Sequence, residues 1–171
     1  LIDHSGRILG GVTSPDALVI DQPRRRAVAR VLWQGGIRPA ETGVVGRHLT
    51  RRGVTWRADL DDLLEHPSAP LSVYRQGPHT GRAKMSGIRA PSGDLTAVEL
   101  TYLAPNGLVA TGLRVPRKTV GQVPPGSAVR LCAPAARMLV GEGVVTTLSA
   151  MMRFDLPGWA LLSAGNLSRW Q

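Results

Sequence analysis

The stretch LVGEGVVTTLSA, residues Leu139–Ala150, passes from a short apolar run through Gly-Glu-Gly into a helical pattern. Its apolar residues after the glycines recur at the three- and four-residue spacing of an amphipathic helix. The run ARMLVG at 136–141 precedes the glycines as a short strand, and GWALLS at 158–163 follows the helix as another. Strand, helix and strand in this order predict a βαβ unit with parallel strands. AGNLSRW at 164–170 begins a further helix.

Glu142 lies where the first strand of this unit ends. Ligands of open parallel sheets bind beyond the carboxyl ends of the strands, and Gly141 and Gly143 leave room for an ion or a phosphate to approach. A carboxylate at this place is able to hold a hard divalent cation or to act as a general acid or base. The helix dipole offers a structural alternative, since it stabilises a Glu in the first turn by about 0.3–1 kcal/mol. Spacing alone favours that alternative.

Three helices are predicted in the first part of the chain. RRRAVARVLWQGG at 24–36 places apolar residues on one face and ends at Gly35, and ETGVVGRHLTRRGV at 41–54 is amphipathic with Gly53 as a left-handed cap. DLDDLLEH at 59–66 reads as a short third helix. The residues expected to face inward are Ala27, Val28, Val31 and Leu32 in the first helix, and Val45 and Leu49 in the second.

The middle of the chain has the short apolar runs and turn signals of antiparallel strands. KMSGIRA at 84–90, LTAVELTYLA at 95–104 and GLVATGLRV at 107–115 are separated by PSGD and PNG, which predicts a three-stranded meander. Alternation puts Val98, Leu100 and Tyr102 on one face. A basic connector at 114–126 and a further strand, SAVRLC at 127–132, lead into the βαβ unit.

Composition limits the classes of function. With 43% hydrophobic residues the chain has enough apolar side chains for a core. Its 21 Lys and Arg exceed its 12 Asp and Glu, and the net charge of +9 favours a polyanionic partner such as nucleic acid, although an Arg-rich proteome would give the same excess. The single cysteine, Cys132, excludes an internal disulfide and indicates a reducing, cytoplasmic setting.

No apolar stretch is long enough to cross a bilayer. The first residue is Leu, so we expect the chain to be a piece of a longer protein.

The C-terminal third resembles the first half of the toprim domain of phage- and plasmid-borne primases and primase-helicases. LVGEGVVTTLSA and LPGWALLSAGNLSRW follow that family's order of an apolar strand, Glu-Gly, a Thr-x-Leu-Ser helix, a strand and LSAGNL. The chain departs from the pattern at Val145, where a second Glu is common, and at Thr147, where Ala is usual. GRHLTRRGV, TYLAPNGLVA and RKTVGQVPPGSAVRL are similar to the segments that precede toprim in the same proteins.

This resemblance implies the core of a DNA primase that copies single-stranded DNA by metal-assisted nucleotidyl transfer. It implies Mg²⁺ or Mn²⁺ as cofactor, with Glu142 as metal ligand and catalytic residue. The family completes its metal site with an Asp-x-Asp pair on a later strand, and after Glu142 this chain contains only Asp155. The basic segments that match family motifs make Arg51, Arg52 and Lys118 the candidates for phosphate contact, with solvated surface cations as the alternative for each.

The predicted architecture is α/β in two parts. A tail at 1–23, of no clear pattern, precedes a basic α+β subdomain with the antiparallel meander at 24–126 and a partial, Rossmann-like toprim domain at 127–171. Expected partners are a single-stranded DNA template, nucleoside triphosphates and a replicative helicase, and no membrane. Two rival functions remain open: a non-catalytic nucleic-acid-binding module with a remnant toprim half, and a fragment of a toprim nuclease or topoisomerase.

Overall fold

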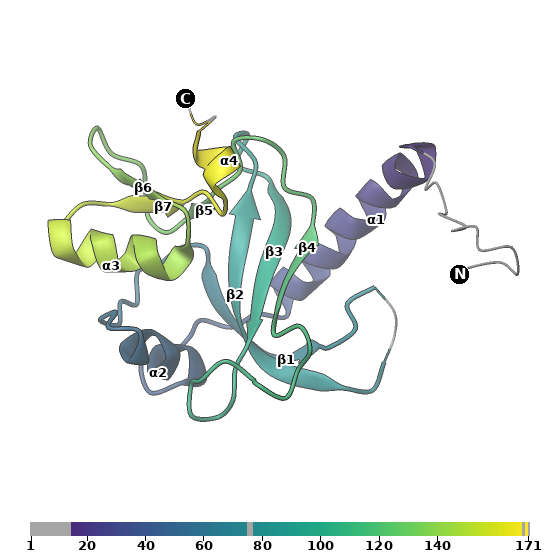
Figure 1. Cartoon of the computed structure of the whole chain (residues 1–171), viewed down its shortest axis with the longest axis horizontal. Coiled ribbons are helices and arrows are strands. Elements are labelled where there is room, and N and C mark those ends of the chain that lie inside the picture. Colours follow the sequence, from purple (N-terminus) through teal and green to yellow (C-terminus); the bar gives the residue numbers. More distant parts are fainter. Residues whose placement is uncertain (1–14, 75–76, 169, 171) are drawn as a thin grey trace, which may run out of the picture.

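The computed structural model describes residues 15–74, 77–168 and 170. It is a mixed α/β structure with two sheets. One has four antiparallel strands in the order β1 (Leu63–Pro70), β2 (Thr80–Arg89), β3 (Leu95–Tyr102) and β4 (Arg117–Gly121), and the other has three in the order β5 (Val129–Arg130), β7 (Gly158–Ala160) and β6 (Leu139–Gly141). In Figure 1, helix α1 (Pro15–Gln34) lies along the four-stranded sheet, while α2 (Val44–Arg51) and α3 (Val144–Phe154) lie on the opposite side of the picture. The expected tail is at 1–23: residues 1–14 fall outside the described residues, and the prediction is wrong for 15–23, which belong to helix α1.

The four-stranded sheet is a meander, as the sequence predicts, but its outer strands are not the predicted ones. Its strands are β1 Leu63–Pro70, β2 Thr80–Arg89, β3 Leu95–Tyr102 and β4 Arg117–Gly121, each antiparallel to the next. Residues 107–115 form no strand and contribute one bridge, between Leu103 and Val109. The last strand comes from the predicted connector because Val120, opposite Val98, is fully buried on the face that α1 covers.

The helix predicted at 59–66 is wrong. Residues 63–66 pair with β2 as the start of β1, and residues 59–62 form turns that lead into it. The spacing of Leu60, Leu63 and Leu64 is that of a helix, but so short an apolar run does not distinguish a helix from a buried strand by periodicity alone. Pairing with β2 decides the outcome, since it buries Leu63 and also satisfies the backbone.

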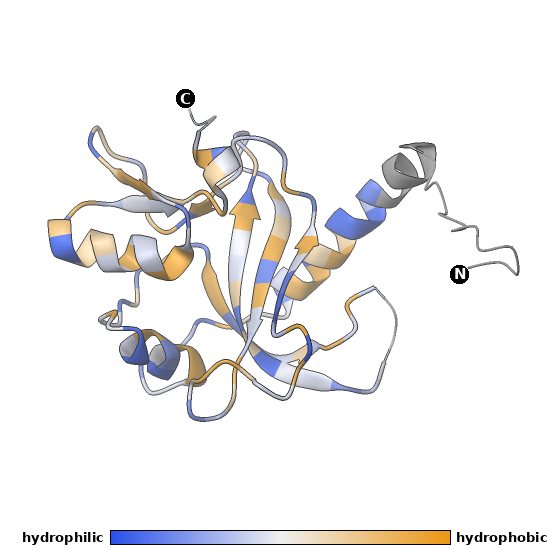
Figure 2. Cartoon of the chain, viewed as in Figure 1, coloured by the Kyte–Doolittle hydropathy of each residue, from blue (hydrophilic) through white to orange (hydrophobic). Residues whose placement is uncertain are grey.

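Helix α1, Pro15–Gln34, begins before residue 24 and includes Pro23. Ala29 and Leu32 are buried against the sheet beside Val98, Leu100 and Tyr102, which share one strand face as predicted. The prediction that Ala27 and Val31 face inward is wrong, since both are exposed. The inward face is the one that bears Ala29 and Leu32, because these side chains pack on the sheet, and on the same side of the helix Arg26 Nε donates to Gln122 Oε1 at 2.9 Å. The colours of α1 in Figure 2 show both its polar and apolar segments.

Helix α2, Val44–Arg51, confirms the second predicted helix. Val45 and Leu49 are fully buried, and Gly53 after the helix has φ +72°, as a left-handed cap requires. Gly43 supplies no side-chain cap, but the buried carboxylate of Glu65 on β1 accepts a hydrogen bond from Val45 N at 3.4 Å. The first turn of α2 is thereby fixed to the sheet.

The three-stranded sheet contains the predicted βαβ unit. Its elements are β5 Val129–Arg130, β6 Leu139–Gly141, α3 Val144–Phe154, β7 Gly158–Ala160 and α4 Ala164–Leu167. Strands β6 and β7 are parallel, and β5 runs antiparallel to β7. The parallel strands joined by α3 confirm the strand–helix–strand prediction. The finer assignment to a toprim domain stays a prediction.

Several residues of the stretches that resemble a toprim domain stabilise the fold itself. The Asn166 side chain accepts from Gly126 N at 2.8 Å and donates to the carbonyls of Ser127 and Leu161, so it ties α4 to the strand ends. A Cβ on Gly141 would lie 2.4 Å from Thr147 Oγ1. Gly141 is therefore required by the packing of α3 on β6, which differs from the role in ligand access that the sequence suggested.

The two sheets share one buried cluster. It joins residues of the predicted subdomain at 24–126, such as Leu49 and Ile88, to residues of 127–171, such as Leu131 and Leu148. The connection is polar as well as apolar. Arg89 and Ala128 exchange backbone hydrogen bonds of 2.8 and 2.9 Å. The end of β2 is therefore bonded directly to the residue that precedes β5.

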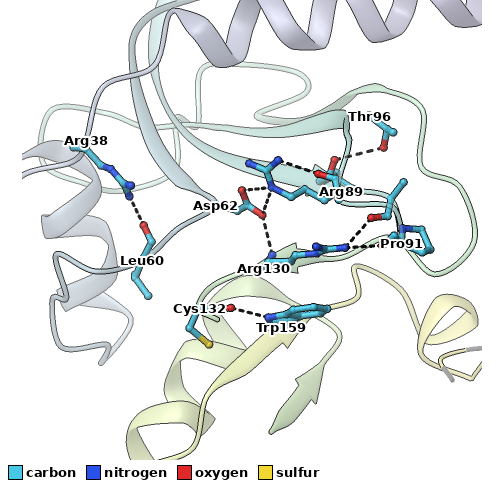
Figure 3. Close-up of polar contacts among 12 residues, drawn as sticks. Arg38, Leu60, Asp62, Arg89, Pro91, Thr96, Arg130, Cys132 and Trp159 are labelled. Atoms are coloured by element: carbon cyan, nitrogen blue, oxygen red, sulfur yellow. Dashed lines mark hydrogen bonds and ion pairs between the residues drawn. The ribbon is translucent and has the colours of Figure 1, made fainter. Parts of the chain in front are cut away.

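Asp62 completes this connection (Figure 3). Its carboxylate is 1% exposed and accepts from Arg89 Nε at 2.8 and 3.0 Å and from Arg130 N at 3.1 Å. Its own backbone donates to the Arg130 carbonyl and accepts from Gly87 N. One side chain thus links the start of β1, the end of β2 and β5.

No helix among the described residues is both long enough and apolar enough to cross a membrane. The cytoplasmic location stays a prediction.

Replacing Asp62 by Ala is expected to lower the free energy of unfolding by about 3 kcal/mol, because Arg89 and the Arg130 amide lose their acceptor. This value is at the low end of the range for removing one partner of a buried ion pair, because Arg89 keeps contact with water. Asp59→Ala is the matched control: it breaks an exposed pair with Arg57 and costs about 1 kcal/mol or less. Urea unfolding followed by Trp fluorescence measures both. Equal losses would show that Asp62 does not hold the sheets together.

Candidate functional site

Glu142 lies in the turn between β6 and α3 and is exposed. Its carbonyl accepts a hydrogen bond from Leu162 N at 2.8 Å, which fixes the backbone. Its carboxylate makes no ion pair or hydrogen bond within the described part of the chain. Gly143, the N-cap of α3, offers no side-chain cap, and a Cβ there would meet nothing nearer than 3.6 Å. The first turn of α3 therefore presents free amide groups, which attract anions.

A cavity of about 320 Å³ opens beside this turn; we call it the Glu142 pocket. It lies between the N-terminus of α3, the C-terminal end of α2 and the face of the four-stranded sheet that α1 does not cover. Its lining residues are His48, Arg52, Lys84, Glu99, Thr101, Arg117, Glu142, Gly143, Val144, Val145, Thr146 and Leu162.

The floor of the pocket is a row of side chains across the sheet. Lys84 on β2 is directly opposite Thr101 on β3, and Thr101 is directly opposite Arg117 on β4. Residues paired in this way share one face of a sheet. Arg52, which follows α2, adds a third cation at the edge. Three cations thus surround the space in front of Glu142.

Lys84 is the least usual member of the row, because its side chain is only 3% exposed. Its Nζ donates to Ser86 Oγ at 3.1 Å and lies 3.6 Å from Glu99 Oε1. Burial lowers the pKa of Lys84 below its usual value, and Arg117 lowers it further, while Glu99 raises it. An anion in the pocket would compensate the cost of burying this charge.

His48 forms part of the wall where α2 meets the loop at 104–107. Its Nδ1 lies 2.9 Å from the Gly107 carbonyl, which only accepts, so Nδ1 carries the proton and Nε2 is bare in the neutral ring. Burial lowers the pKa of His48 below 6.5; the bond to Gly107 opposes this, and the charges of Lys84, Arg52 and Arg117 add to it. The pocket therefore keeps His48 neutral at pH 7.

The structure brings together two of the four predicted site residues. Glu142 and Arg52 line the same pocket. Arg51, one residue away, points elsewhere and donates from Nε to the Asn106 carbonyl at 2.9 Å. Lys118 is on the opposite face of the sheet from its neighbour Arg117: its Nζ donates to the Leu71 carbonyl and lies 5.2 Å from the centre of the Tyr102 ring. Phosphate contact by Arg51 or Lys118 stays a prediction, and neither residue lines this pocket.

Sequence reasoning missed Lys84, Glu99 and Arg117. A signal for Lys84 existed, because it alternates with Ala83 and Met85, which are buried under α1. Polar residues at alternate positions, Thr80, Arg82, Lys84 and Ser86, indicate a polar second face of the strand. No comparable signal marked Arg117, since its segment was interpreted as a connector.

The side chains of the pocket are of the kind that binds a magnesium or manganese ion, but they are too few to form a complete ligand set. Glu142 and Glu99 supply carboxylate oxygens, which hard cations prefer. Within residues 15–74, 77–168 and 170, however, no three His, Cys, Asp or Glu side chains lie close enough together to hold a metal ion. The described residues thus provide part of a ligand set, and the cofactor stays a prediction.

The fold and the pocket define a class: a mixed α/β protein with a basic, carboxylate-bearing cavity between the four-stranded sheet and the start of α3. The chain belongs to the family described as Domain of unknown function (DUF7146), which matches residues 23–131. The match includes Arg52, Lys84, Glu99 and Arg117 and ends before Glu142. A search of curated proteins found no match.

Acid is expected to destabilise the protein below about pH 6.5, through His48. The folded state lowers the pKa of His48, so neutral His48 leaves the stability of the fold at its full value above pH 6.5. Below that pH the unfolded chain takes up a proton more readily than the folded one. The free energy of unfolding then falls by at most about 1.4 kcal/mol per pH unit. His66, whose pKa burial also lowers, contributes in the same direction.

His48→Asn keeps a donor for the Gly107 carbonyl and removes the titration, so the loss of stability between pH 7.5 and 5.5 becomes smaller. Exposed His79, changed to Gln, is the control and keeps the original slope. Urea midpoints at each pH measure the effect. A slope unchanged in His48→Asn would show that His48 does not titrate as described.

Proposed function

We propose that this chain is the template- and nucleotide-binding portion of a DNA primase core, in which Glu142 contributes to metal-assisted nucleotidyl transfer on single-stranded DNA. One observation carries the proposal: an exposed carboxylate at a strand end and the cations of Arg52, Lys84 and Arg117 line one cavity. Phosphodiester synthesis needs negative phosphates held close to a carboxylate, and this pocket offers both kinds of group.

The cations bind and orient the phosphates in this proposal. Arg52 and Arg117 lie at the exposed rim, where planar guanidinium groups form paired hydrogen bonds with phosphate oxygens. Lys84 is a fixed charge beneath them, since Ser86 and Glu99 hold its ammonium group. The amides at the start of α3 add donors from the other side.

Glu142 would hold Mg²⁺ or Mn²⁺ together with phosphate oxygens and with ligands from outside the described residues. When bound, such an ion neutralises the charge that develops on the phosphoryl oxygens. Glu99 is less suited to this task, because its carboxylate is already engaged with Lys84. Nucleoside triphosphates, single-stranded DNA and a replicative helicase are the proposed partners.

The rival proposal is a nucleic-acid-binding module without catalysis. The incomplete ligand set among the described residues favours it. The two proposals agree that the pocket binds phosphate and differ in the task of Glu142, so they need separate experiments.

Binding is tested on the 171-residue chain with a fluorescent single-stranded oligonucleotide. The double variant Arg52→Gln/Arg117→Gln is expected to weaken affinity about tenfold and to reduce the slope of log K against log salt by about 1.4, for two lost phosphate contacts. The control is Arg114→Gln/Arg153→Gln, which removes two exposed charges away from the pocket. Equal losses in both double variants would show that the cations act only through net charge.

Catalysis is tested by Glu142→Gln in the complete natural protein that contains this chain. Primer synthesis is expected to fall strongly, because the metal ion that stabilises the phosphoryl charge loses its carboxylate ligand from Glu142. DNA affinity is expected to stay the same or rise, since a negative charge leaves the pocket. Undiminished primer synthesis refutes the role of Glu142, and DNA binding without primer synthesis in the unaltered protein supports the rival module.

A further inference from the structure

A second cavity, of about 540 Å³, opens at the junction of the two sheets; we call it the tryptophan pocket. It shares no lining residue with the Glu142 pocket. The end of α1, the start of β1, the end of β2 and strands β5 and β7 surround it. Its lining residues are Trp33, Arg38, Asp61, Asp62, Leu64, Arg89, Gly93, Arg130, Cys132, Ala133, Pro134 and Trp159.

Arg130 forms a fixed, flat wall of this pocket (Figure 3). Its guanidinium carbon lies 4.8 Å from the centre of the Trp159 ring, and its NH2 donates to the carbonyls of Ala90 and Pro91 at 2.9 and 3.1 Å. Its Nε is buried and has no hydrogen-bond partner among the described residues. A buried donor without an acceptor is costly, and the two hydrogen bonds from NH2 and the contact with the Trp159 ring hold the side chain in place despite that cost.

Arg38 and Arg89 bring further donors that protein groups do not use. Arg38 donates one N–H to the Leu60 carbonyl, and its other N–H groups have no acceptor in the part of the chain that the structure describes. Arg89 donates from Nε to Asp62 and from NH1 to the Gly93 carbonyl. Its NH2 group has no acceptor among the described residues. Three arginines against Asp61 and Asp62 give the pocket a net positive charge, and Arg89 already neutralises Asp62.

Trp33 gives the pocket an aromatic face of its own. The indole lies against Gly87 of β2, where a Cβ would stand 2.9 Å from the ring, so the strand holds the ring in place. Trp159 is covered by Arg130 and, edge-on, by Trp170 at 5.8 Å between ring centres. Trp33 and the Arg130 guanidinium are therefore the two flat groups of the lining on which a planar ligand can stack.

We infer that the tryptophan pocket binds one nucleotide unit, a flat heteroaromatic base joined to a phosphate. The base stacks on Trp33 and Arg130, Arg38 takes the phosphate, and the exposed Asp61 accepts hydrogen bonds from amino groups of the base. A simple phosphate would not use the indole, and an uncharged aromatic compound would not use the guanidinium groups. The volume is within the range of sites for small ligands. The unit is either a free nucleotide or part of a single strand.

The experiment follows the indole N–H signal of Trp33 by NMR in the 171-residue chain, assigned with Trp33→Phe. Adenosine 5′-monophosphate, ribose 5-phosphate and a short mixed-sequence DNA strand are the probes. Adenosine 5′-monophosphate is expected to shift the signal saturably and to bind roughly tenfold more tightly than ribose 5-phosphate, which lacks the stacking base. Arg38→Gln is expected to weaken this binding roughly tenfold, and exposed Arg114→Gln leaves it unchanged.

A shift with the free nucleotide alone assigns the pocket to a small ligand, and a shift with the DNA strand as well assigns it to a strand. Failure of both probes to shift the signal saturably overturns the inference. So does equal binding of ribose 5-phosphate, or an Arg38→Gln affinity equal to that of the unaltered chain. The variant Arg52→Gln/Arg117→Gln keeps the Trp33 response, so the result is independent of the Glu142 pocket.

Discussion

The carboxylate of Asp62 joins the two sheets, and both pockets depend on that junction. It accepts hydrogen bonds from β2 through Arg89 and from β5 through the Arg130 amide. Burial raises the pKa of Asp62 even though Arg89 opposes this, so the ionised carboxylate carries a real desolvation cost. That desolvation cost is offset by the hydrogen bonds through which the carboxylate fixes β2 and β5 relative to each other. Because β5 pairs with β7, and β7 with β6, the turn that bears Glu142 is fixed relative to the basic face of the four-stranded sheet.

The four-stranded sheet has two faces with different tasks. One is apolar and packs under α1 through residues such as Leu100 and Tyr102. The other carries Lys84, Thr101 and Arg117 in a row toward α3. The same face also contributes Ile88 and Ala97 to the buried cluster between the two sheets, but the charged row itself adds nothing to that apolar core. Its cost is understandable if the charges meet an anion, which is the link between the fold and the proposed function.

The features predicted correctly from the sequence are those that hydrophobic periodicity and turn residues determine. The βαβ unit, the helix at α2 with Gly53 as cap, and the shared face of Val98, Leu100 and Tyr102 are confirmed. The helix predicted at 59–66 and the strand predicted at 107–115 are wrong, because partners distant in the sequence decided the pairing. In the candidate site, Glu142 and Arg52 were found from local motifs. Lys84 and Arg117 were not, since only the register across three strands brings them together.

Glu142 and the cations opposite it are proposed to form one site for a metal ion and phosphate. Paramagnetic broadening by Mn²⁺ tests it directly, in the presence of a nucleoside triphosphate and with the amide signals of the chain assigned. The strongest broadening is expected at Gly143 and Thr146, together with Lys84 across the pocket. Broadening that centres instead on the exposed acidic turn at Asp59 and Asp61, or that is spread evenly over the surface, would contradict it.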